Sequence, residues 1–130
     1  MAKILIIEDN VANMKLVTMM LRNVGHVVVG AADAESGLTL ARAERPALIL
    51  MDVQLPGMDG FTATALLKRE PTTATIPVIA LTAMAMKSDR EKSKVAGCDA
   101  YIAKPLRYQE LYAAIAKLLP AEELQPETDS

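Results

Sequence analysis

A chain of 130 residues, 52% hydrophobic and 23% charged, suits one globular domain with a single core. A formal net charge of -2, with one Phe, three Tyr and no Trp, argues against direct binding of nucleic acid. No apolar run approaches the roughly 20 residues that a membrane-spanning helix needs, so we expect no membrane insertion. The single cysteine, Cys98, excludes an intramolecular disulfide and fits the reducing cytoplasm, where we expect the protein to act. We expect its side chain to behave as a small buried hydrophobe.

Five short apolar runs predict strands. They are rich in Ile, Val and Leu and do not alternate with polar residues, which is typical of strands buried on both faces of a parallel sheet. The runs cover residues 3–7, 26–30, 47–51, 77–81 and 100–103.

A helical pattern follows each of these runs. Gly25 ends the first helix, Asp33 can cap the second, and Asp59-Gly60 opens the third, which closes before Pro71. The residues that mark the helices are Met14, Val17, Leu21 and Val24 in the first, Ala34, Leu38 and Ala41 in the second, 61–68 in the third, 86–96 in the fourth, and Leu111, Ile115 and Leu118 in the fifth, which finishes at Pro120.

Five strand-then-helix repeats predict a doubly wound α/β fold with helices on both faces of a five-stranded parallel sheet. In the flavodoxin-like strand order 2-1-3-4-5, the first and third strands are neighbours. We expect one domain over residues 1–119 and a flexible acidic tail over 120–130.

Polar side chains follow or end four of the five predicted strands. The first run leads into Glu8 and Asp9, the third into Asp52, the fourth into Thr82 and the fifth into Lys104. Ligands of open parallel sheets bind at the carboxyl ends of the strands, where the strand order reverses. We therefore expect these five side chains to converge on one pocket.

The residue types in this pocket point to phosphoryl chemistry. Clustered carboxylates repel one another unless a cation lies among them, and oxygen ligands suit Mg²⁺. A carboxylate can also attack phosphorus and form an aspartyl phosphate. Asp52 is the natural acceptor, the Lys104 ammonium supplies positive charge, and the Thr82 hydroxyl can donate a hydrogen bond.

Four stretches, "IIEDN", "LILMDVQLPGMDG", "IALTA" and "YIAKP", resemble the response-regulator receiver domain over residues 3 to about 119. The stretches "EDNVANMKL", "AMKSD" and "GCDAYIAKP" look closest to DivK-type single-domain regulators and to the receivers of hybrid kinases. The resemblance implies a phosphorelay switch that is not an enzyme acting on a separate substrate. Its partners would be a histidine kinase or a histidine phosphotransfer protein, and a downstream protein.

The resemblance also implies roles for individual residues. Asp9, Asp52 and the backbone carbonyl of Gln54 would hold Mg²⁺, and Glu8 would act mainly through a metal-bound water. Thr82 and Lys104 would contact the phosphoryl group on Asp52, and the Lys104–Pro105 bond would be cis. Tyr101 matches an aromatic switch position that, with Thr82, would reshape the surface of the fourth helix, fifth strand and fifth helix.

Three other hypotheses compete with a complete signalling switch. A flavodoxin would carry a phosphate cradle rich in Ser, Thr and Gly after its first strand, where this chain has "EDNVAN". An aspartyl phosphatase would carry a second acid two residues after its nucleophile, where this chain has Gln54. A receiver cut from a longer kinase or transcription factor stays open, although the initiator Met and polar tail favour a complete protein. His26 opens the second strand, away from the carboxyl ends, and is not expected to take part.

Overall fold

The computed structural model describes residues 2–83 and 87–119, which form five strands and five helices in alternation. Three features expected from the sequence lie outside the described residues. They are Met86 at the start of the fourth helix, Pro120 at the end of the fifth, and the tail after residue 119. The elements are β1 (Lys3–Ile7), α1 (Val11–Asn23), β2 (Val27–Ala31), α2 (Ala34–Glu44), β3 (Leu48–Asp52), α3 (Gly60–Arg69), β4 (Val78–Thr82), α4 (Lys87–Ala96), β5 (Ala100–Ala103) and α5 (Tyr108–Leu118).

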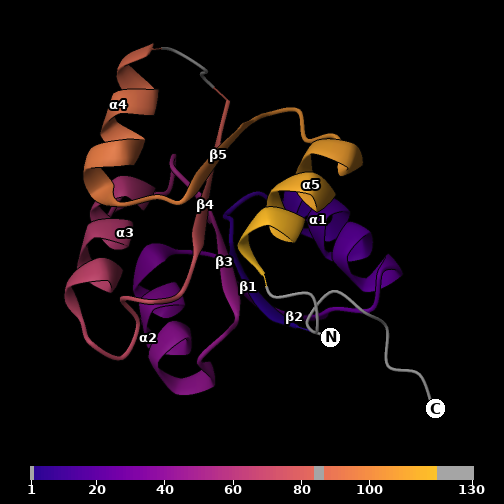
Figure 1. Cartoon of the computed structure of the whole chain (residues 1–130), viewed down its shortest axis with the longest axis horizontal. Coiled ribbons are helices and arrows are strands. Elements are labelled where there is room, and N and C mark those ends of the chain that lie inside the picture. The colour runs from indigo at the N-terminus through magenta and orange to yellow at the C-terminus, as the bar shows by residue number, and fades with distance from the viewer. Residues whose placement is uncertain (1, 84–86, 120–130) are drawn as a thin grey trace.

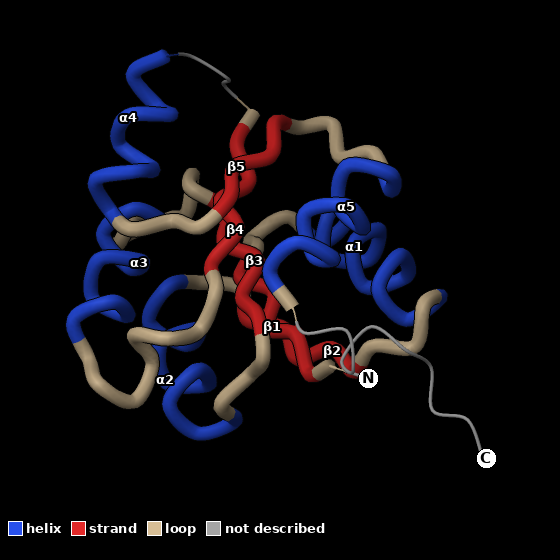
Figure 2. The backbone as a smooth tube through the Cα atoms, viewed as in Figure 1, coloured by secondary structure: helices blue, strands red, loops and turns tan. Residues whose placement is uncertain are grey.

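All five strands are parallel and lie in the order β2-β1-β3-β4-β5, as the sequence predicts. Figure 2 shows them as one twisted column through the middle of the molecule. In the register, Asp52 pairs with Leu81, and Thr82 pairs with Ala103. The carboxyl ends of β3, β4 and β5 therefore lie side by side at one edge of the sheet, and β1 is the other neighbour of β3.

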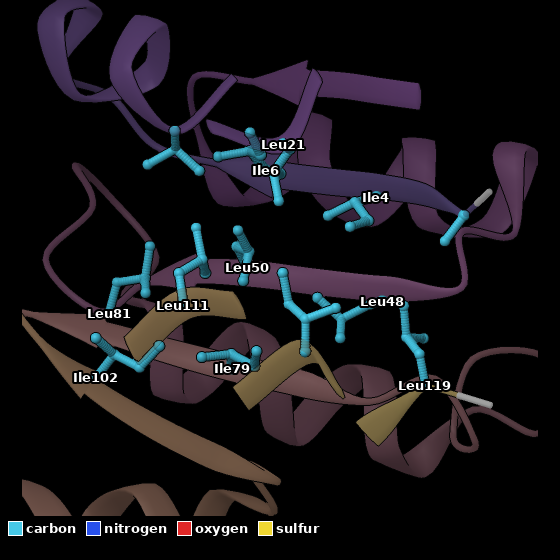
Figure 3. Packing of buried hydrophobic residues seen from close by; sticks show 13 residues of the cluster. Ile4, Ile6, Leu21, Leu48, Leu50, Ile79, Leu81, Ile102, Leu111 and Leu119 are labelled. Atoms are coloured by element: carbon cyan, nitrogen blue, oxygen red, sulfur yellow. The ribbon is translucent and has the colours of Figure 1, made fainter. Parts of the chain in front are cut away.

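Helices cover both faces of the sheet (Figure 1): α2, α3 and α4 lie on one side, and α1 and α5 lie on the other. Because strand side chains alternate between faces, the apolar residues of the strands divide into two cores. Figure 3 shows the core under α1 and α5, where Ile4, Leu48 and Ile79 pack with Leu21 of α1 and Leu111 of α5. The second core joins residues such as Ile49 to α2 and α3.

The strands at the two edges of the sheet are less buried than their apolar runs predict. Every residue of β3 and β4 is buried, whereas Val27 of β2 is 56% exposed and only Ile102 of β5 is fully buried. A run without alternation identifies a strand but does not distinguish an edge from a centre. The predicted bounds of three strands are also one residue early, because Ala31, Asp52 and Thr82 still belong to their strands.

Short polar side chains cap three of the helices that follow strands. Asn10, Asp33 and Asp59 accept hydrogen bonds from backbone N–H groups three residues later, at 2.9, 2.7 and 2.9 Å. The end of α1 differs in part from the prediction. Val24 is the C-cap and is 40% exposed, so it does not share the buried face, while Gly25 follows at φ 89° as expected for a helix stop.

Two residues singled out in the sequence lie away from the carboxyl ends of the strands. His26 is buried just before β2, where its Nδ1 accepts a hydrogen bond from the backbone N–H of Ala2 at 3.2 Å. Cys98 is only partly buried against the second core, and this burial raises the pKa of its thiol. In the described part of the chain, no helix has the length and apolar character to cross a membrane.

Candidate functional site

Asp52 is the last residue of β3, the central strand of the sheet. Four buried apolar residues precede it, and Asp52 itself is only 3% exposed. Its Oδ1 accepts a hydrogen bond from the backbone N–H of Gln54 at 3.0 Å, which turns the chain directly after the strand. The side chain of Asp52 is thus a buried carboxylate at the carboxyl end of β3, where the neighbouring strands also end.

Glu8 and Asp9 follow β1 next to this carboxylate, but their environments differ. The backbone of Glu8 still pairs with β2, donating to the carbonyl of Ala31 at 2.9 Å, and Glu8 is 2% exposed. Asp9 is exposed. One oxygen from each of Glu8, Asp9 and Asp52 lies within 4.8 Å of the others. The three acids that the sequence predicts to converge therefore form one cluster, hereafter the acidic cluster.

Lys104 brings a positive charge into the acidic cluster from the end of β5. Its Nζ lies 2.8 Å from Oε1 of Glu8 and 3.3 Å from Oδ2 of Asp52. The backbone N–H of Lys104 donates to the carbonyl of Thr82 at 2.6 Å, which ties the base of the side chain to β4. The Lys104–Pro105 peptide is cis, as the family resemblance implies.

The charges of the cluster shift one another's protonation. Burial raises the pKa of Glu8 above its ordinary value, and the neighbouring carboxylate of Asp52 adds to this effect more than Lys104 offsets it. Burial alone would lower the pKa of Lys104, but its contacts with Glu8 and Asp52 outweigh this effect and raise it. The site therefore favours the charged form of Lys104 and disfavours the ionised form of Glu8.

Thr82, Gln54 and Tyr101, the other predicted site residues, differ in position and burial. Thr82 is the last residue of β4 and is 1% exposed, and it follows Leu81, which pairs with Asp52 at the end of β3. Gln54 is exposed two residues beyond Asp52. Tyr101 lies on β5, three residues before Lys104, and is half-buried. The ring of Tyr101 lies under the guanidinium of Arg90, whose Cζ is 5.9 Å from the ring centroid.

The turn between β3 and α3 closes tightly over the end of the central strand. Val53 donates its backbone N–H to the carbonyl of Leu81 at 3.0 Å, and Gly60 donates to Val53 at 3.1 Å. A Cβ on Gly60 would lie 2.7 Å from Cα of Val53 and also collide with the carbonyl oxygen of Asp52. Glycine is therefore required where α3 begins, and this close approach fixes the backbone of Asp52.

Three contacts around the cluster do not follow from the sequence pattern. Lys104 pairs most closely with Glu8, although the pattern suggested a role toward phosphoryl oxygens. Asn10, which sequence reasoning did not single out, caps α1 and also donates its backbone N–H to Oε2 of Glu8 at 3.3 Å. An Asn just before a helical pattern was the available signal for the cap. The stacking of Arg90 on Tyr101 had no such signal.

The arrangement offers two chemical abilities. Three carboxylates beside the ammonium of Lys104 form an oxygen-rich site that a small divalent cation such as Mg²⁺ can share. Asp52 is also a carboxylate nucleophile held next to a cation that can neutralise charge on an incoming group.

Comparisons with known proteins agree with this fold. The model of the response regulator receiver domain matches residues 4–116. The polar-differentiation response regulator DivK of Brucella anthropi is 41% identical over 116 residues, which cover 89% of this chain and 94% of DivK. Its counterpart in Brucella ovis is 40% identical over the same length.

Solved structures agree as well. The receiver domain of a sensor histidine kinase from Pseudomonas aeruginosa, with a magnesium ion in its active-site cleft, matches with a TM-score of 0.84 and 37% identity. The match covers 90% of this chain and 96% of that one. The chemotaxis protein CheY4 of Vibrio cholerae matches with a TM-score of 0.87 and 26% identity, over 92% and 99% of the two chains. The chain belongs to the family of response-regulator receiver domains, the switch modules of two-component signalling.

Proposed function

We propose that Asp52 accepts a phosphoryl group from a phosphohistidine of a histidine kinase or a histidine phosphotransfer protein. The observation that carries this proposal is a buried carboxylate at the end of the central strand, 3.3 Å from the ammonium of Lys104. A side-chain oxygen of Asp52 attacks phosphorus while the bond from phosphorus to the donor nitrogen breaks, and that nitrogen keeps the electron pair. The product is an aspartyl phosphate.

Mg²⁺ is the cofactor that the acidic cluster fits, because hard divalent cations prefer oxygen ligands. Glu8, Asp9, Asp52 and the backbone carbonyl of Gln54 are the groups that would hold it. Bound there, Mg²⁺ would supply positive charge next to the transferring phosphoryl group. The magnesium ion in the receiver domain from Pseudomonas aeruginosa supports this assignment.

Two further side chains act on the phosphoryl group. Lys104 already lies beside Asp52. Because its side chain is long and rotatable, its ammonium can exchange its contact with Glu8 for a contact with a phosphoryl oxygen. Thr82 can donate its hydroxyl hydrogen to a second phosphoryl oxygen from the neighbouring strand end. Gln54 cannot act as a general acid, so the chain catalyses only its own phosphorylation and a slow dephosphorylation.

The signal leaves the site through Thr82 and Tyr101. When the Thr82 hydroxyl moves toward the phosphoryl group, space opens for the ring of Tyr101 to turn inward. This rearrangement changes the surface formed by α4, β5 and α5, where a downstream protein would bind. A local charge change then biases a two-state element, and a partner that prefers one state favours it in return.

The proposed setting is the cytoplasm, as the single cysteine suggests. Residues 1–119 would form the receiver domain as one unit. The match to DivK of Brucella anthropi, of which the chain covers 94%, supports a response regulator of the DivK type.

Labelling with a small phosphodonor tests the proposal. Acetyl phosphate and Mg²⁺ should add one phosphoryl group to the wild-type chain, as intact-mass measurement would show. Asp52→Asn should abolish the addition while the circular dichroism spectrum stays the same. Labelling that survives Asp52→Asn, or that proceeds equally well in EDTA, would show that the site is assigned wrongly.

A further inference from the structure

Arg90 of α4 stacks on Tyr101 of β5. Its Cζ lies 5.9 Å from the centroid of the ring, within the roughly 6 Å at which a cation is attracted by the face of an aromatic ring. Arg90 is exposed and Tyr101 is half-buried, so the contact lies at the surface where α4 meets the edge of the sheet. Arg90 lies outside the acidic cluster of Glu8, Asp9 and Asp52.

Tyr101 lies on the same face of the sheet as Thr82. Ile102 and Leu81 point into the core under α1 and α5, and side chains alternate along a strand. Tyr101 and Thr82, each next to one of these residues, therefore point to the face that α2, α3 and α4 cover (Figure 1). Thr82 pairs with Ala103, two residues beyond Tyr101. The stacked ring is thus a near neighbour of the threonine at the proposed phosphorylation site.

A hollow of about 330 Å³ lies beside the stacked pair. Ser93 and Cys98 line it together with Arg90 and Tyr101. This side of the ring borders open space instead of packed core, so packing on this side does not hold the ring in its half-exposed position. In such a setting, a contact of modest strength shifts the ratio of the rotamers.

We propose that Arg90 is a positioning residue that holds Tyr101 half-exposed in the unphosphorylated chain. By stabilising that rotamer, Arg90 sets how often the surface of α4, β5 and α5 adopts its partner-binding form before any signal arrives. This inference rests on the proposed role of Tyr101 in the switch. A cation–π contact at an exposed site corresponds to a roughly two- to fivefold change in the ratio of the two rotamers.

Fluorine NMR of the 3-fluorotyrosine-labelled chain tests this inference without a partner or a phosphodonor. The three tyrosines of the chain give three resonances, and Tyr101→Phe identifies the one that belongs to Tyr101. In unphosphorylated Arg90→Gln, we expect the Tyr101 resonance to move and its solvent isotope shift to fall, because the ring turns inward more often. Arg90→Lys keeps a cation and should restore most of the wild-type position.

Lys92→Gln is the matched control, because Lys92 is an exposed cation on the same helix. A shift in Arg90→Gln no larger than that in Lys92→Gln would overturn the proposal, and so would Arg90→Lys behaving like Arg90→Gln. Failure of the proposed function would look different. The wild type would then not be labelled on Asp52 by acetyl phosphate, while the effect of Arg90 on the Tyr101 resonance would persist.

Discussion

Replacing Lys104 by Met tests how strongly the stability of the acidic cluster depends on the ammonium of Lys104. Methionine keeps an unbranched side chain of similar length but removes the charge that lies 2.8 Å from Glu8 and 3.3 Å from Asp52. At an effective dielectric constant of about 20, these two attractions amount to about 6 and about 5 kcal/mol. Burial of the charged groups cancels much of this, and loss of one partner of a buried ion pair costs about 3–5 kcal/mol.

Thermal unfolding in EDTA measures this loss. An unfolding entropy of about 2.1 cal/mol/K per residue implies a fall in Tm of about 4 °C for each kcal/mol in a chain of this length. We therefore expect Lys104→Met to melt about 11–18 °C below the wild type in EDTA. Mg²⁺ should narrow the difference, because the lysine no longer competes for the carboxylates. Each tenfold gain in Mg²⁺ affinity adds about 1.4 kcal/mol, or about 5 °C, at saturating metal.

Lys3→Met is the matched control for the loss of a lysine. Lys3 lies 3.1 Å from Glu44, but the two side chains are 41% and 40% exposed. Exposed pairs of this kind contribute about 0.2–1 kcal/mol, so the fall in Tm should stay below about 4 °C and be the same with and without Mg²⁺. If Lys104→Met melts as close to the wild type as Lys3→Met does in EDTA, or if Mg²⁺ stabilises Lys104→Met no more than the wild type, Lys104 does not stabilise the cluster in this way.

Two further predictions concern stability in EDTA. The raised pKa of Glu8 means that the folded chain retains a proton that the unfolded chain releases. The stabilisation that this proton gives the folded chain is complete below pH 4.5 and is lost as pH rises through the folded-state pKa, so the urea midpoint should fall toward pH 7. Glu8→Gln should weaken this fall in the urea midpoint toward pH 7, and an unchanged fall would contradict the assignment. Gly60→Ala forces a Cβ against the backbone of Val53 and should cost about 1–3 kcal/mol in urea unfolding. Gly30→Ala, which meets only a flexible Met side chain, should cost less, and equal losses would argue against a tight turn.

The sequence was sufficient to predict the sheet order and the grouping of the strand-end side chains. Apolar runs without alternation identified the strands, and parallel strands bring their carboxyl ends to one edge. Asp52 and Thr82 were therefore expected at the same place from their positions alone. The bounds were less certain, because hydrophobicity ends one residue before backbone pairing does. Asp52 and Thr82 still belong to the sheet although their side chains are polar.

The pairing of charges within the site could not be predicted in the same way. Glu8 and Asp9 are adjacent acids, and only the observed backbone shows that Glu8 turns inward to Lys104 while Asp9 faces solvent. Contacts between long side chains depend on rotamers, which a pattern of residue types does not determine. The stacking of Arg90 on Tyr101 is such a contact, because it joins a charged helix to an edge strand.

The distance along the chain between Glu8 and Lys104 has a consequence for biosynthesis. Their ion pair joins residues 96 positions apart, and Asp52, at the end of β3, lies about midway between them along the chain. A nascent chain therefore cannot assemble the site until β5 has left the ribosome and docked against β4. Truncated products that stop before Lys104 would retain all three carboxylates without their cation. If the proposed phosphorylation holds, such products would lack the lysine that lies beside its acceptor carboxylate.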